Sequence, residues 1–89
     1  MKRVKAEVTG HVQGVGFRAF VQEEALEYAV QGTVQNTAND SVLIHVQGDS
    51  DRVDHFLKAV VKGNRFSKVA EIMQKEEPVQ EGESTFRIV

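Results

Sequence analysis

The stretch VKAEVTGHVQGVGFRAFVQEEALEY, residues 4–28, changes its hydrophobic period in the middle, and this change decides the fold. Up to Val8, apolar and polar residues alternate, which is the period of two typical of a half-buried strand. From Phe17 to Tyr28, apolar residues recur at i, i+3, i+4, i+8 and i+11, which predicts one buried stripe of a helix. A glycine-containing loop joins the two parts, so the stretch predicts a strand–loop–helix unit.

Later stretches with the same period of two predict strands at residues 30–35, 42–46, 69–73 and 86–88. Thr37-Ala38-Asn39-Asp40-Ser41, between the first two, is a turn by composition, so these strands are expected to pair as a hairpin. The alternation within 69–73 is imperfect because Val69 and Ile72 are three positions apart. A β-bulge would explain that spacing.

A second helix is predicted between Asp49 and Gly63. Asp49 and Asp51 supply an N-cap oxygen and acidic residues near the expected helix N-terminus. Apolar residues recur from Val53 at i, i+3, i+4, i+7 and i+8, and Gly63 suits the C-terminal end. The element order is therefore β-α-β-β-α-β, with a short further terminal strand. This order predicts an α+β, ferredoxin-like split β-α-β fold, with two helices on one face of an antiparallel sheet. The other face of the sheet is expected to be exposed to solvent, with His45 solvated there.

Composition narrows the class of protein. The 89 residues are 40% hydrophobic and 27% charged, as expected for one globular domain spanning 1–89. There is no cysteine, so disulfides, thiolate metal sites and cysteine nucleophiles are excluded. No apolar run approaches the ~20 residues of a membrane span, and no signal-peptide core follows the charged N-terminus, so we expect a cytoplasmic protein without membrane contact. The net charge of −2 argues against nucleic-acid binding.

The loop before the first helix has the chemistry of an anion site. Gly14 and Gly16 allow successive backbone N–H groups to turn inward, and the helix that follows adds unsatisfied N–H groups and a partial positive charge. Arg18 stands at the helix start, where a cation is unfavourable by about 0.3–1 kcal/mol. Its guanidinium matches phosphate or carboxylate oxygens. The alternative is a tight strand–helix turn with a solvated arginine.

A dinucleotide fingerprint partly matches the same residues. Residues 14–19 read G-x-G-x-x-A after a strand and before a helix. We reject this reading because the doubly wound fold needs more strands than this chain supplies, and because the next strand ends in Asn36 in place of an acid for a ribose. A P-loop is excluded, since no G-K-[ST] occurs.

The chain resembles the acylphosphatase family over essentially its whole length. Residues 10–18 read G-H-V-Q-G-V-G-F-R, which contains the family hallmark V-Q-G-V-G-F-R unbroken. Residues 32–36, G-T-V-Q-N, match a second signature that reads roughly G-W-V-x-N, and residues 48–57 match a later G-x-x-x-x-V-x-x-F-L pattern. The resemblance implies a ferredoxin-like fold and metal-independent hydrolysis of the carboxyl-phosphate bond of small acyl phosphates, without a cofactor.

The resemblance also implies the site residues. Arg18 would clamp the phosphoryl group and Asn36 would hold the attacking water. The loop that cradles the phosphoryl group would consist of Gln13, Gly14, Val15, Gly16, Phe17 and Arg18. Inorganic phosphate would be the product and a competitive inhibitor, and a monomer is expected.

The residue types are compatible with this chemistry even without the resemblance. Phosphoryl transfer asks a protein mainly for positioning and charge stabilisation, and an amide can orient a water by donating and accepting at once. The alternative for Asn36 is a turn-starting asparagine that binds its own backbone. The departures from the family pattern remove no catalytic group; they are Thr33, Gln35, Ala29 and Asn64, where relatives often have tryptophan, a basic residue, glycine and proline.

A second class of function remains open, a non-catalytic anion-binding or regulatory module on the same fold. Such a module could be part of a larger carbamoyl-transfer protein. Because the chain begins with Met1 and ends with its last predicted strand, we expect a stand-alone enzyme. His11 and His55 are expected at the surface, since the scatter of the three histidines gives no metal-ligand spacing.

Overall fold

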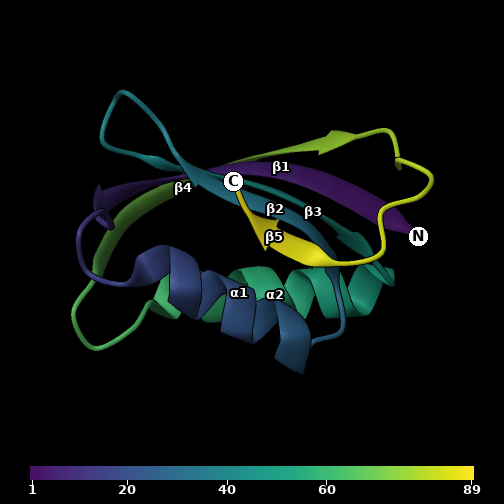
Figure 1. Cartoon of the computed structure of the whole chain (residues 1–89), viewed down its shortest axis with the longest axis horizontal. Helices are drawn as coiled ribbons and strands as arrows, with labels where there is room; N and C mark the ends of the chain where they lie inside the picture. The colour runs from purple at the N-terminus through teal and green to yellow at the C-terminus, as the bar shows by residue number, and fades with distance from the viewer.

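The computed structural model describes residues 1–89 and has seven elements (Figure 1). They are β1 (Lys2–His11), α1 (Phe17–Glu27), β2 (Gln31–Asn36), β3 (Val42–Gly48), α2 (Ser50–Lys62), β4 (Lys68–Glu77) and β5 (Phe86–Ile88). The sheet order is β4-β1-β3-β2-β5. The predicted ferredoxin-like fold is confirmed. Every strand pair is antiparallel except β2 with β5, so the short terminal strand makes the sheet mixed.

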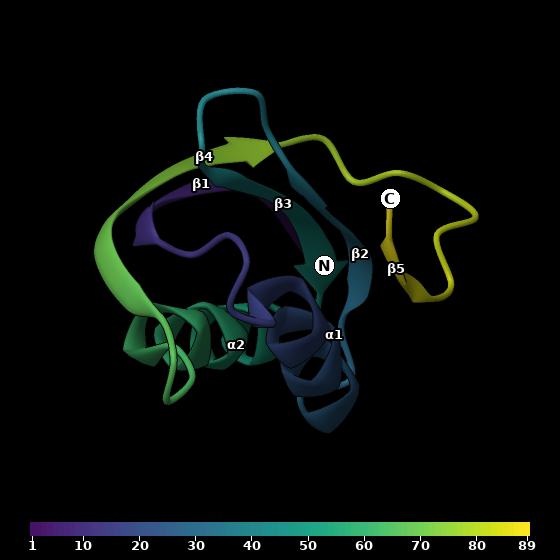
Figure 2. The same ribbon diagram turned by 60° about the vertical axis from the view of Figure 1, so that its left-hand side comes forward.

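Both helices pack on one face of the sheet, as Figures 1 and 2 show from two directions. The buried stripes predicted from the sequence form the core there: Phe17 and Val21 of α1 and Phe56 of α2 are at most 1% exposed. Alternate residues of β1, β2 and β3 meet them from the sheet, among them Val34 and Ile44. The change of period in residues 4–28 thus marks the junction of β1 and α1.

The imperfect alternation in β4 is a β-bulge, as predicted. Thr9 of β1 pairs with Glu71 and Gly10 with Val69, so that Ala70 is an extra residue in β4. The bulge lets Val69 and Ile72, three positions apart, both pack against the core.

The expectation of a wet outer sheet face was wrong in one region. Arg3 is 4% exposed and Gln47 is 2% exposed on that face. Residues 78–85 cause this burial: they connect β4 at one edge of the sheet with β5 at the other, and Gln80 exchanges two hydrogen bonds with Gln47, at 2.8 and 2.9 Å. The period of two shows which residues of a strand share a face, but it does not show whether a later segment of the chain covers that face.

Charged and polar groups at this connection form the outer-face cluster, which consists of Arg3, His45, Gln47, Glu77 and Glu83. Arg3 Nε donates to Glu77 at 2.9 Å and Arg3 Nη1 to Gln47 at 3.0 Å, while Nη1 lies 3.6 Å from Glu83. His45, predicted to be solvated, is half-buried and has its Nδ1 2.6 Å from Glu77 Oε2. Burial would raise the pKa of Glu77, but the hydrogen bonds and charges of His45 and Arg3 outweigh it and lower that pKa.

The end of α1 has an unusual backbone. The N–H of Ala29 donates to Leu26 O at 3.2 Å and the N–H of Val30 to Ala25 O at 3.0 Å, which is a Schellman motif. The motif requires a left-handed residue, and Ala29 accordingly has φ 56°. Glycine adopts this conformation without the Cβ penalty that alanine carries.

Candidate active site

The loop between β1 and α1 presents unpaired backbone donors. Gly14 and Gly16 have φ 74° and 73°, and a Cβ at either position would meet no heavy atom within 4 Å, so backbone conformation and not crowding calls for glycine. Gly16 is the N-cap of α1, without a side-chain cap and without an acidic residue in the first turn. The first N–H groups of α1 are therefore available to an external anion.

Two predicted site residues from different elements meet at this loop. A pocket of about 210 Å³ is lined by Val12, Gly14, Gly16, Phe17, Arg18, Ala19, Asn36 and Ile88. Arg18 comes from the first turn of α1 and Asn36 from the end of β2. Neither side chain is a member of any ion pair or side-chain hydrogen bond within the protein, so the local backbone bond considered for Asn36 is absent. The pocket combines a free guanidinium, a free amide and a helix N-terminus.

The remaining predicted loop residues lie behind the pocket. The Gln13 side chain donates to Thr37 O at 3.1 Å and to Ser41 O at 2.8 Å, and so ties the loop to the β2–β3 turn. Val15 is half-buried and packs against the core. Gln13 and Val15 thus belong to the loop without lining the pocket.

Two residues from distant parts of the chain lie near the pocket and were not predicted from the sequence. Ile88 lines it because β5 pairs in parallel with β2, placing Ile88 opposite Val34 and close to Asn36. Asn64, in the connection between α2 and β4, donates from its side-chain amide to Val15 O at 3.1 Å. Neither contact leaves a signal in local spacing, because each depends on how distant segments are brought together.

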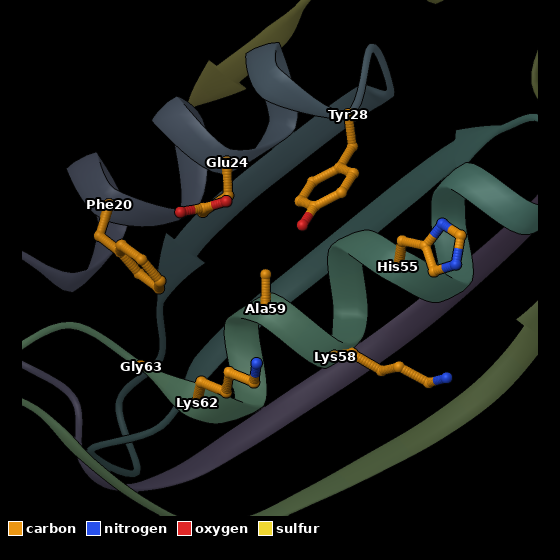
Figure 3. Close-up of a pocket in the computed structure, with 8 residues that line it drawn as sticks. All are labelled: Phe20, Glu24, Tyr28, His55, Lys58, Ala59, Lys62 and Gly63. Atoms are coloured by element: carbon orange, nitrogen blue, oxygen red, sulfur yellow. The ribbon is translucent and has the colours of Figure 1, made fainter.

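A second hollow, of about 400 Å³, lies between the two helices (Figure 3). Phe20 and Glu24 of α1, with Tyr28 at its C-terminal end, form one stripe that faces Ala59 and Lys62 of α2. Its lining comes from helix interiors and ends, where most backbone N–H groups are already bonded within the helix. It therefore lacks the fixed donors that the smaller pocket has, and the smaller pocket is the better candidate for anion chemistry.

The fold and the pocket define a class of protein, a small ferredoxin-like domain with a candidate anion site at a glycine loop. A family model described as acylphosphatase matches residues 4–88. The chain is 44% identical to an acylphosphatase of Clostridium acetobutylicum, over 100% of this chain and 98% of the relative. The chain belongs to the acylphosphatase family. It is an enzyme with acylphosphatase activity.

Solved structures agree with this family. The crystal structure of an acylphosphatase from Bacillus subtilis matches with a TM-score of 0.95 at 40% identity, covering 100% of this chain and 99% of that one. A region of full-length HypF, solved in a phosphate- and nucleotide-bound form, matches with a TM-score of 0.88 at 32% identity. It covers 99% of this chain but 12% of that larger chain. Neither helix of the present chain is long and apolar enough to cross a membrane.

Proposed function

We propose that the β1–α1 loop binds the phosphoryl group of a small acyl phosphate. The observation that carries this proposal is the meeting of the free Arg18 guanidinium with the uncapped N-terminus of α1 in one pocket. Both offer N–H donors to phosphoryl oxygens, and both carry positive charge that would stabilise the charge developing in the transition state. Arg18 is the clamp, and the backbone of residues 13–18 forms the cradle.

Asn36 is the residue proposed to orient the attacking water. Its amide has a donor and an acceptor, neither used within the protein, and it lines the same pocket from the sheet side. The water attacks phosphorus while the bond from phosphorus to the carboxylate oxygen breaks. The carboxylate leaves with the electron pair of that bond, and the proton from the water passes to solvent or to the phosphate product. A carboxylate is a good leaving group, so no strong general acid is required.

The reaction is proposed to proceed without a metal ion or cofactor. The positive charge that a metal would bring to the phosphoryl group comes here from Arg18 and from the helix N-terminus. The same donors bind inorganic phosphate, which is therefore expected to act as a competitive inhibitor. We further propose that the enzyme works as a monomer in the cytoplasm.

The alternative of a non-catalytic module has one observation behind it, the match to a small region of the much larger HypF chain. It is not favoured, because relatives named acylphosphatase match this chain over nearly their whole length.

Hydrolysis of benzoyl phosphate in the presence of EDTA tests the proposal. We expect turnover that chelation leaves unchanged, with phosphate monoesters reacting far more slowly. Loss of activity in EDTA, or a robust monoesterase rate, would contradict the proposed mechanism.

A further inference from the structure

Three connections meet at one end of the molecule: the β1–α1 loop, the β2–β3 turn and the α2–β4 connection (Figure 1). Gln13 joins the first to the second, and Asn64 joins the first to the third. The bond from Asn64 Nδ2 to Val15 O, at 3.1 Å, links residues 49 positions apart. It ends on the proposed phosphate loop itself, between the two left-handed glycines.

The bond constrains one peptide group of the loop. Val15 C=O and Gly16 N–H belong to the same planar trans peptide, so they point in opposite directions. With the carbonyl held toward Asn64, the Gly16 N–H is directed away from the α2–β4 connection. Gly16 is one of the residues that line the Arg18 pocket.

Little else prevents this peptide group from turning over. A flip would change ψ of Val15 and φ of Gly16, and glycine populates negative φ about as readily as its present φ of 73°. There is open space around the Cα of Gly16, since a Cβ there would meet nothing within 4 Å. A flipped peptide would aim a carbonyl oxygen where the loop is expected to offer a donor.

The Asn64 amide is itself held in place. The Asn64 N–H donates to Ser67 Oγ at 3.0 Å, and the Ser67 N–H donates to Asn64 O at 3.3 Å, so a short turn fixes its backbone. Asn64 Oδ1 is buried and accepts no hydrogen bond, which costs free energy in this orientation of the amide. The reverse orientation would set Oδ1 against Val15 O, two acceptors facing each other, so Val15 decides which way the amide lies.

We propose that Asn64 is a positioning residue for the phosphate loop, which holds the Val15–Gly16 peptide so that the Gly16 N–H is available to the phosphoryl oxygens. The inference rests on the proposed role of that loop. A proline at this position, as the family pattern often has, would lack the side-chain donor, so the device belongs to this chain's own sequence.

Asn64→Ala is the most direct test, because it removes the amide donor and adds no charge near the proposed phosphate loop. Asn64→Asp is the second variant; it keeps the shape and replaces the donor by an acceptor, and its negative charge also repels phosphate. For both we expect the inhibition constant of inorganic phosphate to rise about tenfold, the loss of one net hydrogen bond. We expect KM for benzoyl phosphate to rise and kcat to fall with it.

Asp49→Ala is the matched control, since it removes the N-cap at the opposite end of α2 and touches no residue of the loop. It should lower stability while the phosphate inhibition constant stays at the parent value. A purely structural role for Asn64 would make Asn64→Ala behave like this control, with lower stability and parental phosphate affinity. That result would overturn the inference.

A readout independent of catalysis separates this inference from the proposed function. The residual dipolar coupling of the Gly16 N–H, measured without phosphate, reports the direction of that bond. We expect it to change in Asn64→Asp and to stay at the parent value in Asp49→Ala. An unchanged coupling in a folded Asn64→Asp would refute the peptide-holding role. Failure of the proposed function would show instead as parental phosphate affinity in Arg18→Ala.

Discussion

The two arginines Arg3 and Arg18 carry the same group in opposite surroundings. Arg3, 4% exposed, has its donors taken by Glu77 and Gln47, with Glu83 nearby. Arg18 is half-buried at a helix start and has no partner in the protein. The role of each arginine therefore depends on the hydrogen-bond acceptors around it and not on the residue type. Arg3 is bonded to acceptors and stabilises the fold, whereas the donors of Arg18 remain available to a ligand.

The two helix starts repeat this contrast. The N-terminus of α2 is satisfied internally, because the Asp49 carboxylate accepts from two backbone N–H groups and Asp51 stands in the first turn. The N-terminus of α1 has neither a side-chain cap nor an acid, and Arg18 stands where α2 has Asp51. Substitutions at the N-terminus of α1 should therefore affect activity, whereas substitutions at the N-terminus of α2 should affect stability.

Arg18→Ala should have the largest effect. We expect kcat to fall at least ~100-fold and phosphate binding to weaken, because a preorganised donor is lost from both the bound substrate and the transition state. The free energy of unfolding should change by less than about 0.5 kcal/mol. Arg52→Ala, in the exposed first turn of α2, is the control and should leave kinetics unchanged. Parental phosphate affinity in Arg18→Ala would reduce the loop to a simple turn.

Asn36→Ala should lower kcat by a comparable factor of ~100, yet leave the phosphate inhibition constant within about threefold of the parent. That pattern marks an interaction made chiefly in the transition state. Steady-state kinetics with phosphate as inhibitor measures both quantities. Asn39→Ala, in the exposed β2–β3 turn, should behave like the parent. Near-normal turnover in a folded Asn36→Ala would exclude the water-orienting role.

Arg3→Met should give the opposite result to Arg18→Ala. Removing the guanidinium takes a buried cation away from the largely buried carboxylates of Glu77 and Glu83, which keep only His45 and the more exposed Arg87 as neighbours, so the free energy of unfolding should fall by roughly 2–4 kcal/mol. Chemical denaturation measures this loss, and kcat at a temperature where the variant is folded should match the parent. Lys5→Ala, an exposed neighbour on β1, should cost less than about 0.5 kcal/mol. Loss of activity in folded Arg3→Met would couple the two regions.

The outer-face cluster should also make stability depend on pH. The pKa of Glu77 lies below its ordinary value of 4.5 in the folded protein, so the unfolded chain binds the proton more readily. Glu77 therefore stabilises the fold above about pH 4.5, and this contribution is lost as the pH falls through the folded-state pKa. Relative to Glu77→Gln, the parent should be more stable by about 1–2 kcal/mol at neutral pH. Denaturation curves should show this difference shrinking in acid; a constant difference would contradict the linkage.

Ala29→Gly should have the smallest effect and lies away from both arginines. Because Ala29 is left-handed at the end of α1, glycine should stabilise the fold by about 0.5–1 kcal/mol without changing kcat. Ala38→Gly, in an exposed turn without a positive φ, is the control and should give no stabilisation. A lower denaturation midpoint for Ala29→Gly would indicate ordinary helical angles at this residue.

Local periodicity predicted much of this molecule from its sequence. The elements and the β4 bulge follow from patterns only a few residues long. The expectation that Arg18 and Asn36 belong to one site came from the family resemblance, and both side chains line the same pocket. The burial of Arg3 and the place of Ile88 did not follow, since each depends on residues 78–88 returning across or beside the sheet. The amide bond from Asn64 was equally invisible, because hydrogen bonds between distant loops have no period.

The β4 bulge also bears on how separate molecules behave toward one another. β4 is a ten-residue strand at a free edge of the sheet, and such an edge is a template onto which a strand of another molecule could add. Here the extra residue Ala70 interrupts the regular ladder, and the exposed side chains of Lys68, Glu71 and Lys75 add charge along it. Both features discourage edge-to-edge pairing, so the irregularity that seats Val69 and Ile72 in the core also protects the protein against aggregation.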